Sequence, residues 1–245
     1  MLIKFKTIKN MFINKYVNKG AIKNNCLMLL LYNIATPTSM LFVKLSISPN
    51  TITSISILFS IIAFLFLILS KGFLFFMVFW SLAIYLDFCD GTVARMINKK
   101  SEYAFNYDHM SDIFKISLVL LGVGLRYNSK IVWIFTFVSL FLFLYMTILN
   151  HDLGHYKNNI DIKETDTLSI VKQTWIISMF NSMKSIPLLA NLLTIFMTIN
   201  AHTLFGFLLF PLGEFQTTIF LMYFIIITTF ISIRVLKKLV ILKIN

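Results

Sequence analysis

Four aspartates lie close together in the sequence: Asp87, Asp90, Asp108 and Asp112. Residues three or four positions apart share one face of a helix, so Asp87 pairs with Asp90, and Asp108 with Asp112. Four carboxylates in one place repel each other unless a cation joins them. Mg²⁺, and similarly Mn²⁺, takes carboxylate and phosphate oxygens as ligands. The pattern therefore predicts a divalent-metal site that acts on phosphate groups.

The residues between these aspartates suit phosphate chemistry. Gly91 lets a substrate approach the backbone closely, because it has no Cβ atom. Arg95 offers a planar fork of donors that matches phosphate oxygens, and Ala94 keeps the space beside it small. The segment therefore indicates a phosphate-binding surface next to the metal ligands.

The composition indicates that this site belongs to a membrane protein. The 245 residues are 58% hydrophobic and only 13% charged, whereas soluble domains have about 25% charged residues. The formal net charge of +12 raises the alternative of nucleic-acid binding. However, the basic residues are spread over short loops and the termini, which favours a topology signal and contact with anionic lipid.

Repeated apolar runs near 20 residues predict an all-α, polytopic bundle of six transmembrane helices. The expected spans are 51–70, 73–89, 108–125, 131–149, 186–207 and 215–233. The apolar stretch 26–45 is interrupted by Asn33, Pro37 and Lys44, which favours an amphipathic interfacial helix over a seventh span. We divide the chain into an N-terminal segment (1–48), a membrane domain (49–236) and a short tail (237–245).

The distribution of positive charge predicts the topology. If both termini are cytoplasmic, only Lys71, Arg126 and Lys130 of the 22 basic residues fall in outside loops, as the positive-inside rule requires. A seventh span would break this pattern. The second span ends and the third begins on the cytoplasmic side, so the four aspartates are expected there, in an integral membrane protein.

The aspartate segment resembles the signature of the CDP-alcohol phosphatidyltransferases of class I, D-x2-D-G-x2-A-R-x8-G-x3-D-x3-D. The chain departs from it at Ala104, where the family has its second glycine. Upstream, Pro49 to Thr53 resembles the P-N-x-x-T that often precedes this signature; Asn50 and Thr53 serve either to start the helix or to line a nucleotide pocket. The signature positions matched are Asp87, Asp90, Gly91, Ala94, Arg95, Asp108 and Asp112.

The resemblance implies a mechanism. The four aspartates hold two metal ions bridged by the pyrophosphate of a CDP-linked donor, and Gly91, Ala94, Arg95 and Ser101 contact its nucleotide part. Asp112 resembles the general base, which takes the proton of an acceptor hydroxyl. This hydroxyl attacks phosphorus and CMP leaves. We expect CDP-diacylglycerol as donor, a small alcohol as acceptor, a role in phospholipid biosynthesis and, from the family, a homodimer.

Two other functions remain open at this point. One is transfer from a soluble CDP-alcohol to a lipid or polyol acceptor. The other is a cation transporter whose acidic residues form the ion site, which predicts carboxylates near mid-bilayer on broken helices.

A few further polar residues have alternative interpretations. Lys115 either neutralises the aspartates, binds a phosphate of the acceptor, or reaches the membrane interface with its long side chain. His151 and His155 have the spacing of a metal pair on a helix, but no third ligand is evident. Arg126 is expected to anchor its helix at the membrane interface.

Overall fold

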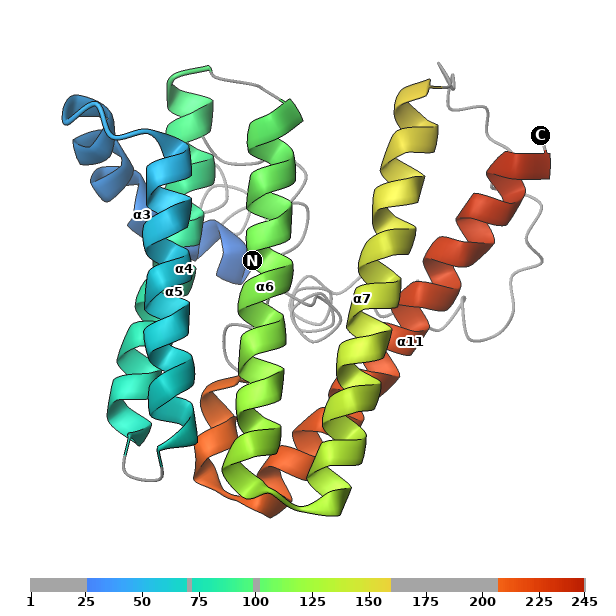
Figure 1. The fold of residues 1–245 in the computed structure, drawn as a ribbon. Coiled ribbons are helices and arrows are strands. Elements are labelled where there is room, and N and C mark those ends of the chain that lie inside the picture. The colour runs from blue at the N-terminus through green and yellow to red at the C-terminus, as the bar shows by residue number, and fades with distance from the viewer. Residues whose placement is uncertain (1–25, 70–71, 99–101, 160–206, 245) are drawn as a thin grey trace, which may run out of the picture.

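The computed structural model describes residues 26–69, 72–98, 102–159 and 207–244. Within these ranges the chain forms six α-helices, one short 3₁₀-helix and no strand. Figure 1 shows α4, α5 and α6 close together, with α7 and α11 beside them. The elements are α3 (Cys26–Lys44), α4 (Pro49–Ile68), α5 (Phe73–Met96), α6 (Glu102–Tyr127), α7 (Lys130–Asn159), η3 (Phe207–Leu212) and α11 (Glu214–Ile244).

Five of the predicted spans coincide with helices α4, α5, α6, α7 and α11. The predicted end of the second span at Cys89 was too early, since α5 continues to Met96 and carries Asp90, Gly91 and Arg95 on its last turns. The predicted fifth span, 186–207, lies outside the described residues except for Phe207, which begins η3.

Four helices of the described part are long and apolar enough to cross a membrane: α4, α5, Lys130–Leu153 of α7 and Glu214–Val240 of α11. The helix α6 is not among them, because Asp108, Asp112 and Lys115 make it more polar. The predicted interfacial helix, α3, is also not among them. The chain is thus an integral membrane protein, with four spans evident from length and composition in the described residues.

The start of α4 follows from its sequence. The Ser48 hydroxyl accepts a hydrogen bond from the backbone N–H of Thr51 at 3.2 Å, and Pro49 occupies the first helical position, where no N–H is needed. Asn50 and Thr53 therefore do not cap the helix. They lie on its first turns, at the end of the bundle where α5 ends and α6 begins, which is at the top of Figure 1. We call this the site end.

The helices pack around an aromatic core, defined here as Phe76, Trp80, Phe207, Phe210 and Phe224. Each of these side chains is at most 2% exposed. The Phe207 ring lies 5.6 Å from that of Trp80 on α5 and 6.1 Å from that of Phe224 on α11, between centroids, which joins η3 to the bundle. Large apolar side chains also point outward, such as Phe141, which is 67% exposed, as expected for helices that face lipid.

Helix α3 packs against α5, to which polar contacts fix it. The hydroxyls of Thr38 and Tyr85 lie 2.5 Å apart, and the Ser39 hydroxyl donates to the backbone carbonyl of Cys89 at 3.3 Å. Cys89 itself is buried and packs between the helices. The helix α3 is therefore held directly behind the segment of α5 that bears the aspartates.

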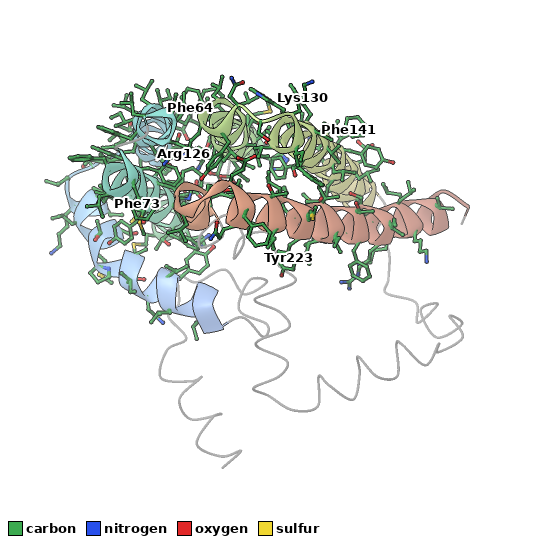
Figure 2. The ribbon with its side chains drawn as sticks, turned by 90° about the horizontal axis from the view of Figure 1, so that it is seen from below. Phe64, Phe73, Arg126, Lys130, Phe141 and Tyr223 are labelled. Carbon is green, nitrogen blue, oxygen red and sulfur yellow. The ribbon has the colours of Figure 1, made fainter. Side chains whose placement is uncertain are left out.

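Arg126 lies in the last turn of α6, and this end of α6 is at the bottom of Figure 1, opposite the site end. Its guanidinium donates to the backbone carbonyls of Leu67, at 2.8 Å, and of Leu69, at 3.3 Å. Leu67 lies in the last turn of α4, where carbonyls lack helical partners, and Leu69 is its C-cap residue, whose carbonyl also accepts from the N–H of Gly72 at 2.9 Å. Figure 2, which views the bundle from this end, labels Arg126 beside the blue-green ribbons of α4 and α5. Arg126 thus ties α6 to α4.

Candidate functional site

Three of the four predicted aspartates come together at the site end. Asp87 and Asp90 lie one turn apart on α5, and Asp108 lies on the facing turn of α6. One carboxylate oxygen from each lies within 4.8 Å of the other two. Two oxygens on the same Mg²⁺ are at most about 4.2 Å apart, because each lies about 2.1 Å from the ion. Small side-chain rotations therefore suffice for the three carboxylates to hold one divalent ion.

The hydroxyl of Thr53 on α4 fixes the most buried of these carboxylates. Thr53 donates to Oδ2 of Asp90 at 2.6 Å, and the two residues are only 2% and 3% exposed. Such a hydrogen bond orients a carboxylate and stabilises its ionised form. The sequence suggested a nucleotide pocket or a cap for Thr53. The structure places its hydroxyl against a candidate metal ligand, and the nucleotide pocket stays a prediction.

Asp112 takes a different position from the other three aspartates. It is not part of the group of three. Its Oδ1 atom lies 2.9 Å from the ammonium of Lys115, and its side chain is 46% exposed. Asp112 therefore lies beside the candidate metal site and open to solvent or substrate.

Lys115 joins the two sets of carboxylates. Its ammonium pairs with Asp87 as well as with Asp112, and the residue is only 4% exposed. A buried ammonium is stable only when it is paired, and here it has two carboxylate partners. Of the three roles considered from the sequence, this geometry favours charge neutralisation within the site over extension to the membrane interface.

Arg95 folds back along α5, where Gly91 leaves room for it. A Cβ atom built at position 91 would lie 3.4 Å from Nη1 of Arg95. Its Nη2 donates to the Thr92 hydroxyl at 3.2 Å, and its Cζ lies 5.1 Å from the ring centroid of Tyr32 on α3. The guanidinium is therefore held one turn beyond the aspartates, where it can contact a phosphate group.

An open hollow of about 510 Å³ lies between α4 and α6 at the site end. The hydroxyls of Ser54 and Tyr107 lie 2.9 Å apart and join the two helices there. The sequence singled out Asn50 in this hollow but missed Ser54 and Tyr107. The position of Tyr107 next to Asp108 was a usable signal. The lining residues are Asn50, Thr51, Ser54, Ile55, Leu58 and Tyr107.

The remaining predicted residues are only partly placed. Ala94 is half-buried on α5. Ser101 and the side chains of Ala104 and His155 lie outside the described residues. His151 stacks with His109 of α6, with ring centroids 6.3 Å apart, so the structure pairs it across two helices.

The comparisons with known proteins agree with this geometry. Residues 46–199, more than half of the chain, match the family described as CDP-alcohol phosphatidyltransferase. The match includes α4, α5, α6 and α7, and it begins after α3. No curated protein matches the chain.

Proposed function

Because the chain belongs to the CDP-alcohol phosphatidyltransferase family, whose members transfer phosphate-alcohol groups from a CDP-alcohol, we propose that it is a membrane enzyme of phospholipid synthesis. Its donor in this proposal is CDP-diacylglycerol, and its acceptor is a small polar alcohol. The observation that carries the proposal is the convergence of Asp87, Asp90 and Asp108 within 4.8 Å.

The donor set at this point suits Mg²⁺ or Mn²⁺. Three carboxylates from two helices provide the hard oxygen ligands that these ions prefer, and they leave coordination positions for phosphate oxygens. When bound, the ion polarises a phosphoryl group and stabilises the charge on the leaving phosphate. The family is metal-dependent, which agrees with this assignment.

The residues of the chain provide orientation and proton transfer. Thr53 holds Asp90 in place, and in this proposal the Arg95 guanidinium donates to a phosphate oxygen of the donor. Asp112, half-exposed beside the metal ligands, accepts the proton of the acceptor hydroxyl. The hydroxyl oxygen then forms a bond to the phosphorus that carries the diacylglycerol. The bond from this phosphorus to the oxygen of CMP breaks, and CMP leaves with the electron pair.

The hollow between α4 and α6 favours a lipid-linked donor over a soluble one. Its polar residues, Asn50 and Tyr107, lie near the site end, whereas Ile55 and Leu58 lie one to two turns further along α4. Ile55 and Leu58 are 39% and 54% exposed. A molecule with a polar head at the site end and a chain along the apolar part matches this order.

We also propose that the site end is cytoplasmic, with both termini on that side. Among the described residues, Lys44 and Arg95 lie at this end, whereas Arg126 and Lys130 lie at the opposite end, as the positive-inside rule predicts for a cytoplasmic site end. The membrane domain in this proposal covers 49–236, and the enzyme acts as a homodimer, as the family suggests.

A cation transporter fits the helices less well. Transporters place their ion ligands near mid-bilayer on interrupted helices. Here Asp87 and Asp90 lie on the last turns of the continuous helix α5, and Asp108 lies near the start of α6. The aspartates therefore lie at one end of the bundle, where a nucleotide in water can reach them.

The proposal is tested by offering the purified protein CDP-diacylglycerol in vesicles with Mg²⁺ and a panel of acceptors. The panel contains glycerol 3-phosphate, serine and inositol phosphate. We expect CMP release together with one new phospholipid, identified by mass spectrometry. Release of CMP only from soluble CDP-alcohols would replace the proposed donor, and no release with any donor would contradict the function.

Asp112→Asn tests the proposed base. The amide keeps the size of the side chain but does not accept the proton, so we expect transfer to fall by about 10²–10⁴-fold without loss of folding. Asp152→Asn is the matched control, since Asp152 is exposed on α7. Full transfer activity in Asp112→Asn would remove its role as base.

A further inference from the structure

Lys115 lies where a second cation of this site would be expected. Its ammonium touches Asp87, which is also a ligand of the candidate metal site, and Asp112, which is outside that site. In a site with two metal ions about 3.5–4 Å apart, the second ion would need this same pair of carboxylates. The ammonium already forms an ion pair with each of them.

Replacing this ammonium by a divalent ion would be costly. Lys115 is 4% exposed and lies more than three turns inside α6, which begins at Glu102. If a metal ion displaced the ammonium from both carboxylates, a buried positive charge would remain next to two divalent ions and without its partners. Breaking a buried ion pair in this way is strongly unfavourable, because the charge left behind is neither paired nor solvated.

We propose that the Lys115 ammonium takes the place of the second divalent ion, so that this site binds a single metal ion on Asp87, Asp90 and Asp108. This inference rests on the proposed metal site and changes its ion count. It also explains the position of Asp112. Held by Lys115 outside the group of three, its carboxylate is not blocked by a metal ion.

Counting bound Mn²⁺ tests this inference independently of activity. The full chain, purified in lipid nanodiscs, is titrated with Mn²⁺, and electron paramagnetic resonance reports both free and bound ions. We expect about one Mn²⁺ per chain, with the spectrum of an isolated ion. In Lys115→Met the space between Asp87 and Asp112 becomes available, and we expect about two ions per chain with a spin-coupled spectrum.

Two further variants separate charge from other effects. Lys115→Arg keeps a positive charge between the carboxylates and should still bind about one ion. Lys130→Met removes an exposed lysine at the opposite end of the bundle and is the matched control. Circular dichroism of each variant shows whether it is folded.

Three results would overturn the inference. They are two ions per chain in the unchanged protein, one ion in a folded Lys115→Met, and no bound ion at all. The outcome of the CMP-release assay is independent of the number of bound ions. One bound ion without CMP release would leave the inference standing and reject the proposed function, whereas two bound ions with CMP release would do the reverse.

Discussion

The bundle has two buried regions that are built in different ways. Towards the opposite end, the aromatic core joins α5, η3 and α11 through ring contacts such as that between Trp80 and Phe207, whose centroids lie 5.6 Å apart. Towards the site end, apolar packing is joined by polar contacts between helices, as between Thr53 and Asp90 and between Lys115 and Asp87. The aromatic side chains are at most 2% exposed, whereas the site end combines buried residues such as Asp90 with Asp112, whose side chain is 46% exposed.

The difference shows which region sets stability and which sets function. In a membrane the apolar interior resembles the surrounding lipid, so helices associate through close packing and hydrogen bonds. The aromatic core supplies packing and contains no group that could act on a phosphate. The site end gathers carboxylates whose mutual repulsion opposes folding until cations offset it. Substitutions in the two regions should therefore separate stability from activity.

Phe76→Ala should have the largest effect on stability. The ring is fully buried and stacks near Trp80, so its loss leaves a cavity that costs about 3–5 kcal/mol. Unfolding in detergent by urea, followed by tryptophan fluorescence, measures this change. Phe215→Ala, at a side chain that is 73% exposed, is the control and should change little. CMP release per folded molecule should stay near that of the unchanged protein in both variants, and a selective loss of activity in Phe76→Ala would break the division between the regions.

Thr53→Val should give the intermediate effect, a lower affinity for the metal ion. Valine keeps the shape of threonine but leaves Asp90 without its 2.6 Å hydrogen bond. Loss of such a partner to a ligand lowers metal affinity by about 10–100-fold. The Mg²⁺ concentration that gives half-maximal CMP release measures this loss of affinity. Thr53→Ser keeps the hydroxyl and should retain most of the metal affinity of the unchanged protein. An unchanged Mg²⁺ requirement in Thr53→Val would show that Asp90 does not need this contact or is not a ligand.

Much of the site follows from spacing along single helices. The interval between Asp87 and Asp90, and the start of the predicted third span at Asp108, predicted that carboxylates from two helices meet. The helical class and the membrane location followed equally from apolar runs of the right length. These are local properties of the sequence, and they do not depend on how the helices pack against one another.

What the sequence could not predict are contacts between helices. That Thr53 reaches Asp90, or that Lys115 bridges Asp87 and Asp112, depends on the rotation of α4 and α6 about their axes. Periodicity gives the shared face of a helix but not the partner that this face meets. For the same reason the role of Arg126 as a cap for α4 was not foreseen, although its place at the end of α6 was.

The contacts of helix α3 indicate how far the site extends beyond the residues matched by the family. It precedes residue 46, yet its Tyr32 ring lies 5.1 Å from Cζ of Arg95 and packs edge-on against Phe88 at 5.0 Å. A ring face attracts a guanidinium by about 0.5–1 kcal/mol at a partly exposed position, so Tyr32 restricts the orientations of Arg95. The N-terminal segment would then contribute to donor binding.

Tyr32→Leu should therefore give the smallest of these effects, a rise of about two- to fivefold in KM for the CDP-linked donor at unchanged kcat. Leucine keeps apolar packing but removes the ring face, whereas Tyr32→Phe keeps the ring and should behave nearly as the unchanged protein. Steady-state CMP release over a range of donor concentrations separates the two parameters. An equal rise in KM in the leucine and phenylalanine variants would assign the effect to the hydroxyl of Tyr32. A fall in kcat alone would mean that α3 supports the fold of α5 without positioning Arg95. The expected split, with KM changed only when the aromatic face is lost, would place α3 within the donor site even though the residues matched by the family begin after it.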